Sequence, residues 1–328
     1  MASLPLTFAC GLYDRVLPLY TGEVQAAGID LNFIAINNPR IIFDRMGGGM
    51  EFDASEFSSS EFICRLSTGD RSFVALPHFP SRVFRHSMIT INKRSGIKSP
   101  KDLEGKRVGT SLYTQTAAVF IRGMLQHDHG VDLTKIHWVQ GALNQAGPHG
   151  HPTVPPLLKP VKIEVADPRK SLSDLLDKGE IDAIVSTNLP KAMKHNPDIQ
   201  RLFPNYREVE KDYYKRTGIF PIMHLVAMRR DVYEKHPFAA TSLYEALTKS
   251  RELVRDRIAE TGALRYMLPW MTADVDEINE VFGGDCWPDG IEPNRKTLEA
   301  LVTYLYESHM IAKPIPLEEI FVRTFHSH

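Results

Sequence analysis

Residues 6–36, LTFACGLYDRVLPLYTGEVQAAGIDLNFIAI, carry the pattern that decides the fold class. Two β-like runs, 6–12 and 29–36, flank a stretch at 14–28 that we interpret as helical. A second helical segment follows at 39–49, where consecutive glycines would end the helix. The order β-α-β-α is typical of a parallel sheet covered by helices.

The same alternation continues along the chain. Ser58 and Glu61 have the spacing of a capping box, which predicts a helix directly after the short strand in FDASEF. Ser99 is predicted to be the N-cap of a further helical turn, and a strand is predicted to follow at 106–110. One more β-α-β unit is predicted at 162–166, 171–179 and 181–187. The sequence therefore predicts an α/β fold.

Size and charge limit the possible partners. A chain of 328 residues fits two lobes of moderate size better than one core. The formal net charge of −1 argues against nucleic acid as a partner. Cys10, Cys64 and Cys286 lie far apart without a C-x-x-C pair, which argues against a disulfide framework or a thiolate zinc site.

Targeting signals are not evident in the sequence. The first 15 residues lack a signal-peptide pattern, and no segment approaches the ~18 consecutive apolar residues of a membrane span. We therefore expect a cytoplasmic protein without a membrane partner, and we expect it to form a homo-oligomer. The sequence also lacks G-x-G-x-x-G, Walker A and G-x-S-x-G motifs, so nucleotide cofactors and serine hydrolysis are unsupported.

Polar loops follow several predicted strands and open the next helix. In open α/β sheets such loops lie at the carboxyl edge, where helix N-termini favour anions. The pattern predicts an anion-binding cleft. Its candidate polar contacts are Ser59, Ser60, Thr110, Thr114 and Asn188, although hydroxyls at helix starts are more often caps than ligands.

Several ordered segments resemble a known fold. The turn DLEGKRVGTS (102–111), the stretch FDASEFSSSEFI (52–63) and the return strand in GIFPIMHLVAMRRDV (218–232) are similar to the type 2 periplasmic binding protein fold. That resemblance implies two lobes, each with a mostly parallel sheet flanked by helices, and a site between them. It implies that lobe I comprises residues 1–91 and 220–328, and lobe II residues 92–219, joined by a two-strand hinge.

Within that superfamily, FPSRVFRHSMITIN (79–92) and WPDGIEPNRKTLEALVTYLYE (287–307) resemble the 4,5-dihydroxyphthalate decarboxylases. The resemblance implies a non-oxidative loss of CO₂ from 4,5-dihydroxyphthalate, a small aromatic dicarboxylate, with 3,4-dihydroxybenzoate as the product. The alternative is a solute-binding protein for an aromatic or sulfonated anion without catalytic activity. A thiamin-precursor synthase of the same fold is a further alternative, but the clustered cysteines expected of that group are missing.

Three arginines are candidates for holding the substrate's carboxylates. Arg15, Arg82 and Arg85 could each donate two parallel hydrogen bonds from a planar guanidinium. If 82–88 is a strand, Arg82 and His86 share one face and could address one ligand. For any single arginine, a structural ion pair or a surface contact is an equally good interpretation.

Proton transfer requires an acid and a base near neutrality. Histidine has the only unperturbed side-chain pKa in that range, so His86, His224 and His78 are the candidate proton donors. Glu56 or a histidine could take the phenolic proton. The alternative for each histidine is a structural hydrogen bond, and Glu56 could instead complement a helix dipole.

A Pro- and Gly-rich segment at 143–160 is too long for a simple connection and is the candidate lid. It contains His149 and His151, which could reach the substrate or a divalent metal. The pair His127 and His129 instead fits a helix C-terminus. We expect no required cofactor, with a divalent metal as the open alternative.

Overall fold

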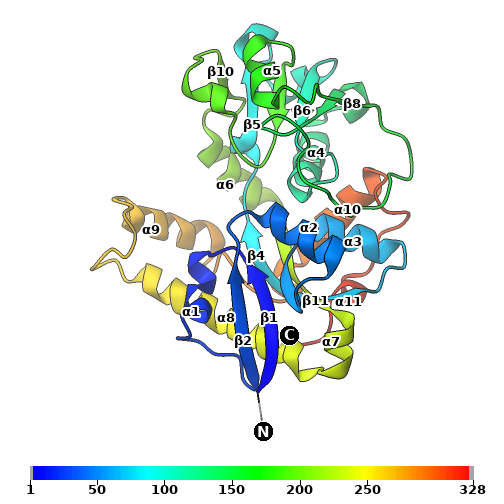
Figure 1. The fold of residues 1–328 in the computed structure, drawn as a ribbon. Coiled ribbons are helices and arrows are strands. Elements are labelled where there is room, and N and C mark those ends of the chain that lie inside the picture. Colours follow the sequence, from blue (N-terminus) through cyan, green and yellow to red (C-terminus); the bar gives the residue numbers. More distant parts are fainter. Residues whose placement is uncertain (1–2, 325–328) are drawn as a thin grey trace.

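Two α/β lobes, one above the other in Figure 1, form the computed structural model, which describes residues 3–324. One lobe contains a 5-stranded sheet in the order β2-β1-β3-β11-β4, and the other a 6-stranded sheet in the order β10-β5-β9-β6-β7-β8. The predicted two-lobed α/β fold is confirmed. Both sheets are mixed, however, because β11 in the first and β5 in the second run antiparallel to their neighbours.

The first sheet is built from segments at both ends of the chain. β1 pairs in parallel with β2 and β3, while β11 lies antiparallel between β3 and β4. Every residue of β3 is buried, so this short strand is enclosed by protein on both faces. The strands are β1 (Leu4–Cys10), β2 (Ile29–Ala35), β3 (Ala54–Ser58), β4 (Phe73–Arg82) and β11 (Ile222–Arg229).

Most helices of this lobe come from the final third of the chain. They are α1 (Leu17–Tyr20), α2 (Pro39–Gly49), α3 (Ser59–Ser67), α7 (Arg230–Lys235), α8 (Phe238–Ala259), α9 (Met271–Phe282), α10 (Arg295–Glu307) and α11 (Leu317–Ile320). The helix predicted at 14–28 is reduced to a 3₁₀ turn and the four residues of α1. Gly22, whose φ is +79°, turns the chain out of the helix soon after α1.

The second sheet lies in the upper lobe of Figure 1. Its strands are β5 (Ile89–Asn92), β6 (Arg107–Thr110), β7 (His137–Gln140), β8 (Ile163–Val165), β9 (Ala183–Val185) and β10 (Ile199–Arg201). Its helices are α4 (Thr116–His129), α5 (Leu172–Lys178) and α6 (Tyr206–Thr217). In the part of the chain that the structure describes, no helix is long and apolar enough to cross a membrane.

The chain crosses between the lobes at 83–88 and returns at 218–221. Because β5 belongs to the second sheet, the first crossing lies before the predicted lobe boundary at residue 91. The predicted strand through 82–88 is wrong: β4 ends at Arg82, and a 3₁₀ turn begins at His86. The crossing is set by a distant contact, since the amide of Val83 donates to the carbonyl of Pro221.

Helix α4 connects the two lobes. Although it follows β6 of the upper lobe, its first turns bring Ala117, Val119 and Phe120 into the hydrophobic core of the lower lobe. Gly123 permits this approach, since a Cβ there would lie 2.3 Å from a ring carbon of Tyr304 on α10. The N-terminus of α4 is thereby fixed at the junction between the lobes.

Candidate active site

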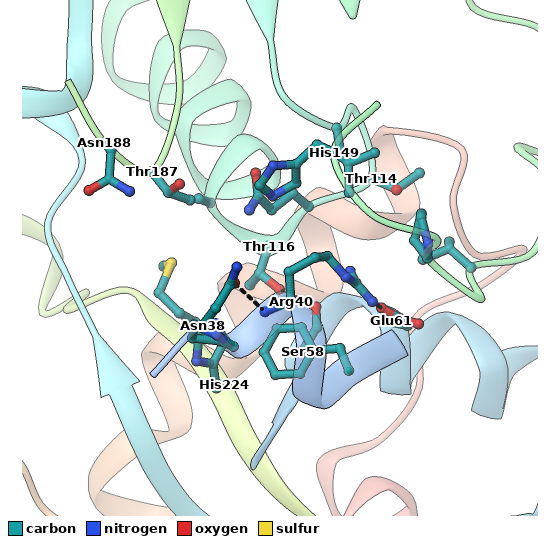
Figure 2. Close-up of a pocket in the computed structure, with 18 of the residues that line it drawn as sticks. Asn38, Arg40, Ser58, Glu61, Thr114, Thr116, His149, Thr187, Asn188 and His224 are labelled. Atoms are coloured by element: carbon teal, nitrogen blue, oxygen red, sulfur yellow. Dashed lines mark hydrogen bonds and ion pairs between the residues drawn. The ribbon is translucent and has the colours of Figure 1, made fainter. Parts of the chain in front are cut away.

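A cavity of about 210 Å³ lies between the lobes (Figure 2). It exceeds the ~150 Å³ of a cavity that holds a benzene ring, so one substituted aromatic ring is a suitable occupant. Its polar lining comes from both lobes and the crossing: Asn38, Arg40, Ser58, Glu61, Arg85, Thr114, Gln115, Thr116, His149, Thr187, Asn188 and His224.

Three helices begin at this cavity. Asn38, Ser58 and Gln115 are the N-cap residues of α2, α3 and α4, and all three line it. Helix N-termini carry partial positive charge and unpaired amides, so their convergence favours an anion. The Ser58 hydroxyl makes no capping bond, contrary to the predicted capping box, and lies 3.1 Å from the Thr116 hydroxyl instead.

Arg85 is the buried cation of the crossing segment. Its side chain lines the cavity with only 6% of the residue exposed, and its Nη1 donates to the carbonyl of Thr187 at 3.3 Å. Its Nε makes no hydrogen bond to any described residue. Burial lowers the pKa of Arg85 to about 10, so the group is still charged at neutral pH. A buried guanidinium with free donors is well suited to receive a carboxylate.

Arg40 is a second cavity arginine, and sequence reasoning missed it. Its Nη2 lies 2.7 Å from Asp44 and 3.2 Å from Glu61, while its buried Nε has no partner in the described structure. The two carboxylates already balance much of its charge. Its position at the start of a helix after the polar segment NNP was the available signal.

His224, on β11, lines the cavity and forms a tight pair with Glu56 of β3. Its Nδ1 lies 2.5 Å from Glu56 Oε1, and its ring meets that of Phe43 edge-on at 4.8 Å. With Nδ1 taken by the carboxylate, Nε2 is the nitrogen available to a ligand. The orientation of an imidazole by a buried carboxylate is typical of histidines that transfer protons.

Glu56, predicted as a possible acceptor of the phenolic proton, does not line the cavity. It is fully buried and accepts hydrogen bonds from the Gly11 amide at 3.0 Å and the Tyr13 hydroxyl at 2.8 Å. Burial alone would raise the pKa of Glu56, but His224 and these donors outweigh it and lower the pKa. The residue is therefore an ionised partner for His224.

The candidate lid forms part of the cavity wall. Residues 143–160 contain no helix or strand, and His149 of this segment faces the cavity opposite His224 (Figure 2). The loop is fastened to the lower lobe by Thr153, whose amide and hydroxyl donate to Glu61 at 2.8 and 2.6 Å. Burial, with the charge of Arg40, lowers the pKa of His149. His151 is exposed and lies outside the cavity.

Two predicted arginines have structural partners elsewhere. Arg82 is buried and donates to the carbonyl of Pro288 and the side chain of Asn294. Arg15 donates to the carbonyl of Pro80 at 2.6 Å and stacks on Trp287. Neither lines the cavity. The predicted common face for Arg82 and His86 does not exist, because the strand ends between them.

Two predicted proton donors are also outside the cavity. His78 is fully buried with its Nδ1 2.8 Å from Asp289, in a structural pair. His86 is buried beside α4, between the rings of Phe203 and Tyr213. The hydroxyls of Ser59, Ser60 and Thr110 are buried but do not line the cavity, whereas Thr114 and Asn188 do. Asn38 and Glu61 were not predicted as cavity residues. The polar loops at 58–60, 111–116 and 187–188 were predicted to form the cleft, and they contribute Ser58, Gln115, Thr116 and Thr187 to the cavity.

The two lobes with a cavity between them are the type 2 periplasmic binding protein-like fold. The periplasmic aliphatic sulphonate-binding protein SsuA from Escherichia coli has the same fold, with a TM-score of 0.54 and 11% identity over 98% of each chain. The alkanesulfonate-binding protein SsuA from Xanthomonas axonopodis pv. citri gives a TM-score of 0.51 and 10% identity over 99% of this chain and 100% of that one. A family model described as NMT1/THI5 like matches residues 83–148.

Closer relatives define the family. A 4,5-dihydroxyphthalate decarboxylase from Comamonas testosteroni is 30% identical over 98% of this chain and 97% of its own length. A 4,5-dihydroxyphthalate decarboxylase from Pseudomonas putida is 35% identical over 66% of this chain and 83% of its own. The chain belongs to the 4,5-dihydroxyphthalate decarboxylase family.

Proposed function

We propose that this protein is a carboxy-lyase that converts 4,5-dihydroxyphthalate to 3,4-dihydroxybenzoate and CO₂. The names of its relatives support the substrate. The observation that carries the chemistry is the Glu56–His224 pair, which presents an oriented imidazole to a cavity that also holds the free donors of Arg85.

Binding of the substrate depends on charge. The substrate is a dianion at neutral pH, and Arg85 holds the carboxylate that remains on the ring through charge-assisted hydrogen bonds. The N-termini of α2, α3 and α4 stabilise the second carboxylate, and Thr114 and Asn188 offer polar contacts at the rim. The bound dianion would compensate the positive charge of Arg85, which is buried in the crossing segment.

The first chemical step is removal of a phenolic proton. Each carboxyl-bearing carbon of the substrate has a hydroxyl para to it, so deprotonation raises the electron density at the carbon that will lose CO₂. His149 is the base, because its lowered pKa keeps the imidazole neutral at pH 7. Its position on the lid places it across the cavity from His224.

The second step is protonation of the ring. The ionised Glu56 stabilises a protonated His224, whose Nε2 donates its proton to the carboxyl-bearing carbon and forms a dienone. The carbon–carboxylate bond then breaks, its electron pair restores the aromatic ring, and CO₂ leaves. His149 returns its proton to the phenolate, and solvent reprotonates His224. The net reaction consumes one proton and releases one CO₂.

The protein environment assists these steps. The lid and the two lobes wall the cavity, and the burial of Arg85 and Glu56 strengthens their interactions with charge. We further propose that no organic cofactor takes part, because side chains supply both the acid and the base. Activity retained after chelator treatment would support a reaction that needs no metal at the cavity.

Cellular context follows from the same proposal. We propose that the enzyme acts in the cytoplasm, where its three free cysteines stay reduced. We also propose that it is a homo-oligomer, because Met267, Leu268 and Trp270 expose apolar surface beside α9. Light scattering of the purified chain measures the oligomeric state, and a monomer at all concentrations would contradict this part.

The direct test is incubation with 4,5-dihydroxyphthalate in D₂O, with the product followed by chromatography and NMR. The proposal predicts 3,4-dihydroxybenzoate in an amount equal to the CO₂ released, with deuterium at the vacated ring position. Tight binding of the substrate without any turnover would instead identify a solute-binding protein.

A further inference from the structure

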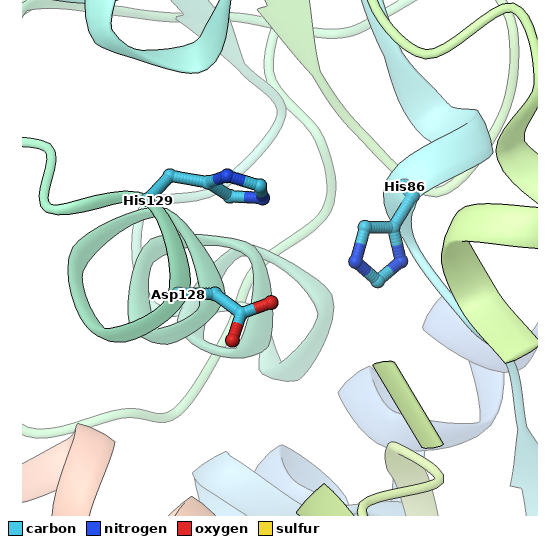
Figure 3. Close-up of side chains that lie close together, drawn as sticks. All are labelled: His86, Asp128 and His129. Atoms are coloured by element: carbon cyan, nitrogen blue, oxygen red, sulfur yellow. The ribbon is translucent and has the colours of Figure 1, made fainter. Parts of the chain in front are cut away.

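Three ligand-type side chains lie together away from the cavity (Figure 3). His86 lies in the crossing from the lower to the upper lobe, and Asp128 and His129 end helix α4. One potential ligand atom from each residue lies within 4.8 Å of the others. None of the three lines the cavity of the proposed reaction.

His86 is buried without a hydrogen bond. Only 1% of the residue is exposed, and neither ring nitrogen has a hydrogen-bond partner among the described residues. Leaving a polar group unsatisfied inside a protein costs roughly 1–3 kcal/mol, so such a side chain needs an explanation. Its Nδ1 faces Glu210, 3.9 Å from Oε1, which leaves Nε2 for a ligand.

His129 and Asp128 also have atoms that can bind a cation. The Nε2 atom of His129 is buried and has no partner in the described structure. Both oxygens of Asp128 accept from Arg216, at 3.0 and 2.9 Å, which fixes the carboxylate. A carboxylate offers about four lone-pair positions, so Asp128 can still bind an ion.

We infer that His86, Asp128 and His129 form a zinc site that fastens the interlobe crossing to helix α4. Two imidazoles and one carboxylate suit Zn²⁺, and a water molecule would complete the tetrahedron. Glu210 would act as the outer carboxylate that orients His86. The site lies outside the cavity, and its proposed role is to hold the crossing segment to α4 independently of the proposed decarboxylation.

The test uses untagged full-length protein, stripped with a chelator and titrated with Zn²⁺ by calorimetry. We expect about one tight zinc per chain, confirmed by elemental analysis, and a rise in Tm when zinc is added. His129→Gln should weaken zinc binding by more than ~100-fold, beyond the roughly 10–100-fold effect of an outer partner. Co²⁺ bound in place of zinc should show the visible bands of a tetrahedral site.

The matched control is His127→Gln, which changes an exposed histidine of the same helix that pairs with Glu307 at 2.7 Å. It should bind zinc as the wild type does. His86→Asn should abolish the zinc-dependent rise in Tm. If His86→Asn fails to fold, the zinc affinity of His129→Gln tests the inference. The inference is overturned if the stripped wild type takes up no zinc or if His129→Gln binds it with unchanged affinity.

Discussion

Glu56 Oε1 and His224 Nδ1 lie 2.5 Å apart, although the residues are separated by 168 positions in the sequence. The antiparallel pairing of β3 with β11 brings the two strands together. Because Glu56 is buried and His224 faces the cavity, the carboxylate acts on the substrate through the imidazole. Glu56 is therefore a positioning residue, and His224 is the catalytic residue of the proposed reaction.

Glu56→Gln keeps the shape of the side chain but removes the charge that stabilises protonated His224. We expect kcat to fall by ~10²-fold or more, within the range of general acid catalysis, with little change in KM. The control is Glu299→Gln on the exposed face of α10. An unchanged kcat in Glu56→Gln would show that Glu56 has only a structural role.

Arg85→Lys tests the proposed carboxylate contact. Lysine keeps the charge but loses the planar pair of donors, so we expect KM to rise by about 10- to 100-fold, since charge-assisted hydrogen bonds contribute about 1.5–3 kcal/mol. Arg82→Lys is the matched variant, because Arg82 is equally buried but has Pro288 and Asn294 as partners. It should lower Tm and leave KM unchanged. Equal KM effects in both variants would contradict this distinction.

His149→Asn removes the proposed base. Because the pKa of His149 lies below its ordinary value, the wild-type kcat should stay level near neutral pH and fall only as His149 becomes protonated in more acidic solution. The variant should lose at least ~10²-fold in kcat together with this acidic limb. The neighbouring His151→Asn, which lies outside the cavity, is the control. A variant that retains the acidic limb would assign the base to another residue.

Asp289 provides a prediction for stability. Burial alone would raise its pKa, but His78 and Arg251 lower the pKa to about 2. Because this pKa is lowered, ionised Asp289 stabilises the folded protein at pH values above its ordinary pKa of ~3.9. This stabilisation is lost as the pH falls toward about 2. Asp289→Asn should cost about 3–5 kcal/mol at pH 7, measured by denaturant unfolding.

The difference in the free energy of unfolding between Asp289→Asn and the wild type should shrink below pH 4, because the carboxyl of Asp289 then also becomes neutral in the wild type. Asp276→Asn, an exposed change on α9, is the control. A difference that stays constant from pH 7 to pH 3 would show that the charge of Asp289 does not contribute.

Local patterns predicted much of the fold. The strand and helix in 52–66 and the unit at 162–187 form where expected, because short-range alternation and helix starts determine them. The crossing at 83–88 was predicted as a strand because its alternation looks the same. Its real path depends on distant partners, such as Glu210, which accepts from the amide of Ser87 across 123 positions.

The candidate site was only partly predictable for the same reason. His224, Arg85 and His149 were found because their residue types suit the chemistry, and the structure brings all three to one cavity. Arg82 and Arg85 lie three positions apart in the same segment, and the sequence does not show that the distant Pro288 and Asn294 are the partners of Arg82. Arg40 was missed because an arginine near a helix start commonly lies on a solvated surface.

His224→Gln tests the central claim most directly, because it preserves a hydrogen-bonding side chain beside Glu56 but removes the titrating proton. The measurement is kcat for 4,5-dihydroxyphthalate, together with the Kd of the substrate for the variant determined by calorimetry. The proposed mechanism predicts a loss of ~10²–10⁴ in kcat with substrate affinity retained. A variant that binds the substrate and converts it at nearly the wild-type rate would contradict the assignment of His224 as the acid.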